Sequence, residues 1–395
     1  MILPVIPPAH SGAGQRGLRM AAALVRRGVS VVIVTHTPNS ELADSPHIPV
    51  FVLKRWADRY AVTSGNRWRR FRTALAAVLT VSDAVSLMLR EKPDVVYQLG
   101  CYVGPQLSGF AAWLCRVPVV AEATLIESDD PVTVRQTLGG ALRHALLRKH
   151  EAFVAISPNI YEVAVASGLD PTRCALIGND VDVQRFRPSG ADEKAILRKA
   201  LELPDEGPLY VSVGRMSPRK GMLELARAFL NDVLPVIPSA RLVLVGPPQG
   251  EDGDAAYGEQ LKYLASQSAS NRVMLVGEVH DAAPWMRAAD AFAFASRFEG
   301  FPNVLTEAMA CGLPIATTAL GGTSRFILGS APGIEVVLGD DELGPAMIRL
   351  HRFVGDEETA AALHDRARRQ FSADVIHEKY HDLFTCVATP LRNRS

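Results

Sequence analysis

Residues 291–317 read AFAFASRFEGFPNVLTEAMACGLPIAT, an order of residue types typical of a strand, a turn, a helix and a second strand. The apolar runs Ala291–Ala295 and Pro314–Thr317 are short and rich in small or β-branched residues, as in buried strands. The helix between them is expected to begin at Pro302 or Asn303. This stretch therefore predicts two parallel strands joined by a helical crossover.

The same alternation of short apolar runs and amphipathic segments extends over most of the chain. The other expected strands are Val29–Thr35, Asp94–Tyr97, Pro118–Ala121, Ala152–Ile156, Leu209–Val213, Arg241–Val245 and Val273–Val276. The other expected helices are Arg16–Arg27, Trp68–Arg90, Pro105–Cys115, Val132–Lys149 and Phe371–Cys386. Repeated strand–helix–strand units of this kind predict an α/β protein with parallel sheets.

The length of the chain indicates more than one domain. A single hydrophobic core rarely grows beyond about 250–300 residues, and this chain has 395. The polar segment Gly178–Pro188 lies between the two strand series and is interpreted as the linker. We therefore expect one domain over residues 1–183, a second over 184–370, and a C-terminal helix in 371–395. A ligand is expected in a crevice at the carboxyl ends of the strands.

Composition excludes several classes of protein. The 42 Lys and Arg balance the 42 Asp and Glu, which argues against a general nucleic-acid binder. A hydrophobic content of 48% excludes a disordered chain. The five cysteines form no CxxC pair and the histidines show no metal-binding spacing, so no metal site is expected. No apolar run approaches the roughly 18 residues of a membrane span and no signal peptide is apparent, so a cytoplasmic protein is expected.

Two glycine-containing segments are candidate phosphate sites. Residues 11–17 (SGAGQRG) precede an expected helix, where free N–H groups and the helix dipole favour an anion; a plain tight turn explains the glycines equally well. Residues 214–221 (GRMSPRKG) follow the first strand of the second series. There Arg215 and Lys220 could converge on one anion, although a solvated basic loop remains the alternative.

The pair Glu299 and Glu307 is the most informative constellation in the chain. Their carboxylates could accept hydrogen bonds from the hydroxyl groups of a sugar or ribose. The N–H groups near Val304 and Leu305, in the first helical turn, could hold a phosphate. The alternative is a capping carboxylate with a surface glutamate, which leaves the glycine and the aromatic residue between the two acids unexplained.

Taken together, these segments resemble the retaining family 4 glycosyltransferases, which have the GT-B fold. Residues 298–322 (FEGFPNVLTEAMACGLPIATTALGG) resemble the E-x7-E signature of that family, and GRMSPRKG resembles its phosphate-binding segment. LIGNDVDVQRFRP, residues 176–188, is similar to its linker, and SGAGQRG to its N-terminal glycine loop. The resemblance covers nearly the whole chain in the right order. It implies two Rossmann-like doubly wound domains facing across a cleft, with the C-terminal helix crossing back to the N-terminal domain.

The resemblance also implies roles for individual residues. Arg215 and Lys220 would stabilise the leaving diphosphate, Glu299 would hold the transferred sugar, and no metal would be needed. The remaining donor-binding positions would be Gly12, Gly14, Gly214, Val279, Gly300, Phe301, Asn303, Val304, Leu305 and Glu307. The donor would be a UDP- or GDP-sugar bound to the C-terminal domain. The acceptor, a glycan, a lipid-linked molecule or a small molecule, would bind the N-terminal domain.

The sequence departs from the family pattern at three places. Thr124 stands where the family often has a histidine that orients the sugar, within the acidic segment VVAEATLIESDDP that also contains Glu122. That segment is expected either to contact donor sugar or acceptor, or to be a solvated loop that ends in an N-cap at Asp130. Asp180 replaces a linker glycine, and Arg325 stands where the family often has a glutamate.

Residues 54–72 are basic and carry interleaved aromatic residues. One interpretation is peripheral contact with an anionic membrane, and the other is a helix that covers the sheet. The leading function is a nucleotide-sugar-dependent retaining glycosyltransferase. The alternatives are a nucleotide-sugar-binding protein without activity, suggested by Thr124, and an epimerase that releases a nucleotide-sugar isomer.

Overall fold

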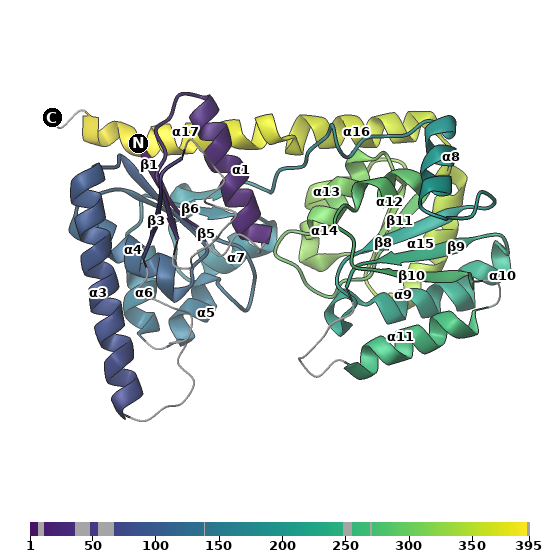
Figure 1. Cartoon of the computed structure of the whole chain (residues 1–395), viewed down its shortest axis with the longest axis horizontal. Coiled ribbons are helices and arrows are strands. Elements are labelled where there is room, and N and C mark those ends of the chain that lie inside the picture. The colour runs from purple at the N-terminus through teal and green to yellow at the C-terminus, as the bar shows by residue number, and fades with distance from the viewer. Residues whose placement is uncertain are drawn as a thin grey trace. The chain divides into compact units, whose positions relative to one another are not determined.

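The computed structural model describes residues 1–6, 12–35, 48–53, 67–137, 139–247, 255–268 and 271–392. The chain divides into two compact units, and both are α/β in architecture (Figure 1). Unit 1 comprises Met1–Asn179 and Ile376–Ser395, and unit 2 comprises Asp180–Val375. Within the described residues, none of the helices combines the length and apolar character needed to cross a membrane.

Unit 1 is built on a parallel sheet in the spatial order β3-β2-β1-β4-β5-β6-β7. Its strands are β1 (Ile2–Ile6), β2 (Ile33–Thr35), β3 (Val50–Val52), β4 (Val95–Leu99), β5 (Val119–Ala123), β6 (Ala152–Ala155) and β7 (Cys174–Leu176). Every residue of β4, β5 and β6 is buried, as expected for strands covered on both faces. The register places Gln98 of β4 beside Ala121 of β5.

Unit 2 is built on a second parallel sheet in the order β10-β9-β8-β11-β12-β13. Its strands are β8 (Leu209–Val213), β9 (Arg241–Val245), β10 (Val273–Gly277), β11 (Ala291–Phe294), β12 (Ile315–Thr318) and β13 (Ile334–Val337). The runs expected as strands in this unit form β8 to β12, whereas β13 was not expected. In unit 1, only Ile33–Thr35 of the expected strand Val29–Thr35 forms β2. In both units the order reverses beside the first strand of the sheet, which is the doubly wound topology of Rossmann-like folds.

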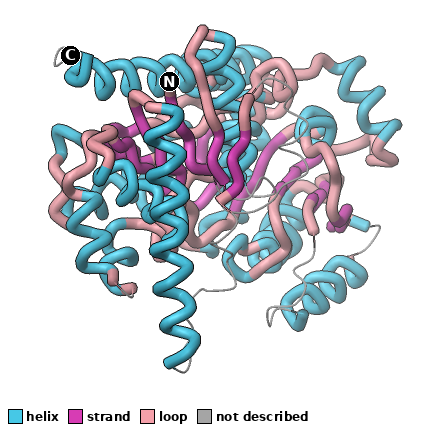
Figure 2. Tube along the Cα trace, turned by 60° about the vertical axis from the view of Figure 1, so that its left-hand side comes forward, coloured by secondary structure: helices cyan, strands magenta, loops and turns pink. Residues whose placement is uncertain are grey.

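Helices flank both sheets (Figure 1). In the tube view, the strands lie between the helices (Figure 2). The helices of unit 1 are α1 (Gly12–Arg26), α3 (Arg67–Glu91), α4 (Val103–Leu114), α5 (Pro131–Gln136), α6 (Gly140–Leu147), α7 (Pro158–Ala166) and the 3-10 turn η2 (Pro171–Arg173). Those of unit 2 are α8 (Ala191–Ala200), α9 (Met222–Ala228), α10 (Leu234–Val236), α11 (Ala255–Gln267), α12 (Ala283–Ala288), α13 (Asn303–Ala310), α14 (Thr323–Leu328), α15 (Leu343–Leu350) and α16 (Glu357–Phe371). Shorter turns of unit 2 are η3 (Pro218–Lys220), η4 (Phe229–Val233), η6 (Leu320–Gly322), η7 (Asp340–Glu342) and η8 (His351–Phe353).

The single helix predicted over Val132–Lys149 is wrong, because the structure divides it into α5 and α6. Gly139 adopts a left-handed conformation with a φ of 69°, which ends helical geometry there. At Gly140 a Cβ atom would lie 2.2 Å from the carbonyl oxygen of Val134, so the chain approaches its own preceding turn too closely for a side chain. The two glycines therefore produce the break.

The C-terminal segment is confirmed as helical, although with different bounds. Residue Phe371, the predicted start, ends α16, and the final helix is α17 (Ala373–Arg392). From Ile376 onward α17 belongs to unit 1, so the chain returns to the unit in which it began. Tyr380 and Phe384 of α17 are fully buried and pack against the ring of Tyr97 in β4. Aromatic burial of this extent fixes the helix on the sheet.

Candidate functional site

The predicted phosphate-binding and carboxylate segments of unit 2 lie at the carboxyl ends of neighbouring strands. Strand β8 leads into residues 214–221, which include η3, and β11 leads into residues 295–302 before α13. β8 and β11 are adjacent and parallel, and the strand order reverses at this point. Open α/β sheets bind ligands at such a reversal, outside the carboxyl ends of the strands.

Lys220 and Glu299 are brought together at this edge of the sheet. The Nζ atom of Lys220 lies 2.6 Å from Oε1 of Glu299, and an Nη atom of Arg219 lies 3.0 Å from Oε2. The hydroxyl of Ser296 donates a hydrogen bond of 2.7 Å to Oε1. The Glu299 side chain is only 9% exposed, so two cations and one hydroxyl compensate a largely buried carboxylate.

Gly221 allows the turn that carries Arg219 and Lys220 to approach Glu299. It adopts a φ of +64°, and a Cβ atom at this position would lie 2.3 Å from the carbonyl oxygen of Ala295. The turn that carries Lys220 therefore packs directly on the end of β11, where only glycine leaves enough room. A backbone hydrogen bond of 2.9 Å from Arg297 to the carbonyl of Arg219 joins the same two segments.

Arg219 is the residue at this site that the sequence analysis did not assign. Besides its ion pair with Glu299, its guanidinium donates to the carbonyl of Phe298 at 3.0 Å and lies 5.4 Å from the centre of the Phe298 ring. The signal was present in the sequence as a basic residue next to Lys220. Without the structure, however, nothing indicated that both adjacent cations face the same carboxylate.

The electrostatics of Glu299 keep it ionised. Burial raises the pKa of this carboxyl, but the nearby charges of Lys220 and Arg219 and the Ser296 hydroxyl outweigh burial, so the pKa lies below its ordinary value of 4.5. A pKa lowered in the folded state stabilises the protein above that ordinary value. The contribution is lost as the pH falls through the lowered pKa.

Replacing Arg219 by alanine is expected to raise the pKa of Glu299, because one of the two cations that favour the carboxylate is removed. The measurement is an NMR titration of the Glu299 side-chain carboxyl carbon in both proteins. The control is Arg297→Ala, since Arg297 pairs with Glu224 instead. An unchanged Glu299 pKa in Arg219→Ala, or an equal rise in the control, would contradict the arrangement.

Arg215 lies at a pocket in unit 2 and not on Glu299. Its side chain is exposed and, among the described residues, its guanidinium has no hydrogen bond or ion pair. The pocket has a volume of about 340 Å³ at the carboxyl ends of β8, β9 and β10. Its lining residues are Val213, Gly214, Arg215, Val245, Gly246, Pro247, Glu278, Val279 and Ala282. Two of the predicted donor-binding residues, Gly214 and Val279, therefore line one pocket with Arg215, which was predicted to stabilise the leaving diphosphate.

The first turn of α13 departs from two expectations. The N–H group of Leu305, predicted to be open to a phosphate, donates instead to the carbonyl of Pro302 at 3.0 Å. The Phe301 side chain is 7% exposed, and its ring centre lies 5.9 Å from that of Phe371, so it belongs to the core of unit 2. The first change is a local hydrogen bond of the opening helical turn, and the second is a packing contact with a residue 70 positions away.

The other residues predicted around α13 are placed as follows. Asn303 and Val304 open the helix and are half-buried, and Glu307 occupies its second turn, also half-buried. Helix α13 ends at Ala310, and Gly312 follows with a φ of +70°, which confirms it as the stop. Asn303 and Glu307 thus remain at the same end of unit 2 as Glu299.

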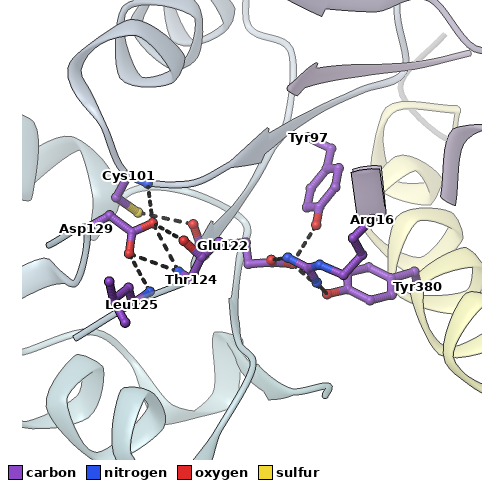
Figure 3. A network of polar contacts seen from close by, with 8 residues as sticks. All are labelled: Arg16, Tyr97, Cys101, Glu122, Thr124, Leu125, Asp129 and Tyr380. Carbon is purple, nitrogen blue, oxygen red and sulfur yellow. Dashed lines mark hydrogen bonds and ion pairs between the residues drawn. The ribbon is translucent and has the colours of Figure 1, made fainter. Parts of the chain in front are cut away.

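In unit 1, the prediction that Glu122 belongs to an exposed polar loop is wrong. Glu122 lies within β5 and its side chain is fully buried. Its carboxylate is ion-paired with Arg16 and accepts hydrogen bonds of 2.5 Å from the hydroxyls of Tyr97 and Tyr380 (Figure 3). Direct contact between this carboxylate and a sugar is therefore not supported.

The loop after β5 is ordered by a second buried acid. Asp129 is fully buried and accepts hydrogen bonds from the N–H groups of Thr124 and Leu125 at 2.7–3.0 Å, from that of Cys101 at 3.3 Å, and from the Thr124 hydroxyl at 2.9 Å (Figure 3). Burial dominates and raises the pKa of Asp129. Asp130 is confirmed as the N-cap of α5. Thr124 thus lies in a rigid loop and remains half-exposed.

The two N-terminal glycines lie in α1 and not before it. The helix begins at Gly12, and Gly14 is buried within its first turn. The predicted start at Arg16 is therefore about one turn too late, since the helix accommodates both glycines in its first turn although glycine is a poor helix former. Residues 54–66 of the basic and aromatic segment lie outside the described residues, and residues 67–72 form the start of α3.

No cluster of three or more His, Cys, Asp or Glu side chains suited to a metal ion occurs in the described parts of the chain.

The family model for glycosyl transferases group 1 matches residues 207–352, and that for the glycosyl transferase 4-like domain matches residues 11–180. The two matches correspond to large parts of units 2 and 1, respectively.

Curated relatives are named D-inositol 3-phosphate glycosyltransferase. The one from Xylanimonas cellulosilytica is 32% identical over 301 residues, which cover 70% of this chain and 69% of the relative. The one from Mycobacterium bovis is 29% identical over 343 residues, covering 80% of this chain and 67% of the relative. Identity at this level extends over both units.

Solved structures show the same fold. HepE from Anabaena in complex with UDP superimposes with a TM-score of 0.77 at 19% identity, covering 98% of this chain and 100% of HepE. A glycosyltransferase from Rickettsia africae gives a TM-score of 0.78 at 16% identity, covering 98% of both chains. HepE has also been solved with UDP-glucose.

Proposed function

Because the chain belongs to the family 4-like glycosyltransferases of the GT-B fold, we propose that it transfers a sugar from a UDP-sugar to a hydroxyl acceptor with retention of configuration. Glycosyl transfer itself follows from family membership. The choice of UDP is supported by the UDP complexes of HepE, a protein of the same fold. The first acceptor to test is an inositol phosphate, since the curated relatives carry that substrate in their names.

The observation that carries this proposal is the placement of cations at the reversal point of the unit 2 sheet, two of them on the Glu299 carboxylate and one at a pocket. Lys220 forms an ion pair with Glu299, and Arg215 lines the pocket that includes Val279. In the proposed reaction, both cations stabilise the negative charge that develops on the leaving diphosphate. Glu299 accepts hydrogen bonds from the hydroxyls of the transferred sugar, and Glu307 from the ribose. The backbone at Val279 contacts the base.

The proposed chemistry is a displacement on one face of the sugar. The bond between the anomeric carbon and the diphosphate oxygen breaks, and the acceptor oxygen bonds to the same face of that carbon. The acceptor proton passes to the departing phosphate oxygen. No protein nucleophile is required, so the task of the side chains is to orient the donor and stabilise the charge.

The test of this function is a transfer assay with a panel of UDP- and GDP-sugars, with and without inositol phosphate. The expected result is release of UDP together with an α-linked product from an α-linked donor. Product with inverted configuration would contradict retention. Conversion of the donor to an isomer without release of UDP would identify an epimerase instead.

Activity is expected to survive chelation of divalent cations, because Arg215 and Lys220 supply the positive charge at the diphosphate. In the presence of EDTA, kcat should stay within about twofold of its untreated value. The measurement is the initial rate of UDP release before and after dialysis against EDTA. A loss that Mg²⁺ or Mn²⁺ restores would show that a metal ion performs this role.

A further inference from the structure

A buried polar network in unit 1 lies within the aromatic packing of α17 on the sheet and has no part in the chemistry proposed above. Its centre is Glu122 of β5, and its other members are Arg16 of α1, Tyr97 of β4 and Tyr380 of α17 (Figure 3). Four elements that are far apart in the sequence therefore meet at one carboxylate. Arg16 and Tyr380 are separated by 364 positions.

Both oxygens of the Glu122 carboxylate are occupied. Oε1 forms the ion pair with Arg16, and Oε2 accepts the hydroxyl protons of Tyr97 and Tyr380 at 2.5 Å each. Arg16 also donates to the hydroxyl oxygen of Tyr380 at 3.1 Å. Glu122 is fully buried and Arg16 is 2% exposed, so solvent does not screen these contacts.

The two tyrosines act as neutral donors. Burial raises the pKa of Tyr97 to about 12 and raises that of Tyr380 well above its ordinary value. At neutral pH both hydroxyl groups therefore keep their protons and can donate them to Oε2. The aromatic rings are fixed as well, since the Tyr97 and Tyr380 ring centres lie 5.8 Å apart.

Stability alone does not account for such a network. Apolar side chains of similar volume often stabilise a core as well as a buried ion pair does, or better, because both ions lose their hydration. What a fully paired network adds is a single permitted arrangement of the elements that contribute to it. Here it fixes the helix that begins at Gly12 and the helix that carries Tyr380.

We propose that Glu122 is a positioning residue for glycosyl transfer, which holds the first turns of α1 and the middle of α17 in one orientation on the sheet. Arg16 lies four positions after Gly12, so the network acts within about one turn of the N-terminus of α1. β5 also continues from Glu122 directly into the loop that Asp129 orders at Thr124. The inference rests on the proposed function, because the start of α1 and the loop at Thr124 matter for catalysis only if unit 1 binds the acceptor.

The first test is Tyr380→Phe, which removes one hydroxyl and keeps the ring. We expect kcat/KM with the donor that wild type uses to fall at least tenfold while the unfolding temperature stays within about 5 °C of wild type. Amide hydrogen exchange in the first turns of α1 should accelerate, although the substitution lies on α17. The matched control is Tyr210→Phe in unit 2, which removes one hydroxyl from a fully buried tyrosine that donates to the carbonyl of Met347.

A second test separates the positioning role of Glu122 from its effect on the stability of the folded protein. In the double variant Arg16→Met/Glu122→Leu, both buried charges are replaced by apolar side chains, so no unpaired charge is left in the core. The expected result is a folded protein whose kcat/KM is reduced at least tenfold. Wild-type kcat/KM in folded Tyr380→Phe, with unchanged exchange in α1, would overturn the inference. A wild-type protein that transfers no sugar from any donor of the panel would contradict the proposed function instead.

Discussion

Replacing Lys220 by alanine is expected to lower kcat by about 10²–10³-fold, the usual effect of removing one group that stabilises charge in a transition state. The ammonium group of Lys220 stands at the carboxyl end of β8, 2.6 Å from Glu299 and in the turn that Gly221 packs onto β11. Binding of UMP should be nearly unchanged, whereas binding of UDP should weaken, because the β-phosphate loses its cation. Steady-state kinetics and calorimetric titration with both nucleotides measure these effects.

The control for this variant is Lys262→Ala. Lys262 lies on α11 and forms an exposed ion pair with Glu259 at 2.9 Å, and such pairs contribute at most about 1 kcal/mol. Its removal should leave kcat and UDP binding unchanged. Equal weakening of UMP and UDP binding in Lys220→Ala would show that Lys220 does not act at the β-phosphate. Thermal unfolding of each variant excludes loss of folded protein as the cause.

Replacing Glu299 by alanine is expected to reduce kcat/KM by about 10–100-fold, the effect of losing a hydrogen bond to a charged acceptor. The loss should be larger for the natural donor than for a donor that lacks the hydroxyl bound by Glu299. A panel of deoxy-sugar donors identifies that hydroxyl, because its removal from the donor and the loss of Glu299 should not be additive.

The surface ion pair of α11 also supplies the control for Glu299. Glu259→Ala removes an exposed carboxylate from the same unit, and its kcat/KM should equal that of wild type. If Glu299→Ala lowers kcat/KM equally for every deoxy donor, Glu299 does not contact the sugar. In that case its effect would be exerted only through Lys220 and Arg219.

Most of the strands follow from local sequence, whereas β3, β7 and β13 were not expected. The runs Leu209–Val213 and Arg241–Val245 form β8 and β9 with the expected bounds, and Gly312 ends α13. Such features depend on residues that are near one another in the chain. Hydrophobic periodicity and glycine geometry report on them directly.

Contacts between segments that are far apart in the chain could not be predicted from local sequence patterns. Glu122 resembles a loop carboxylate because an acidic segment follows it, whereas contacts with Arg16 and Tyr380, 106 and 258 positions away, account for its burial. Phe301 lies between the two glutamates in sequence, yet it packs against Phe371. Burial of a polar or aromatic side chain depends on tertiary partners, which composition and spacing do not reveal.

The glycine break between α5 and α6 illustrates an intermediate case. Gly139 and Gly140 were visible in the sequence, and the amphipathic pattern nevertheless continued across them. Pattern alone favours one helix, whereas the left-handed φ of Gly139 and the close approach at Gly140 require two. A double glycine within a periodic segment therefore indicates a break between two helices.

The most direct test of the central claim is a crystal structure of the protein with UDP. The account predicts that oxygens of the β-phosphate lie within about 3.2 Å of both the Lys220 Nζ atom and the Arg215 guanidinium. The uracil should lie in the pocket lined by Glu278 and Val279. A diphosphate bound elsewhere, with Lys220 still on Glu299 and Arg215 without a phosphate contact, would contradict it.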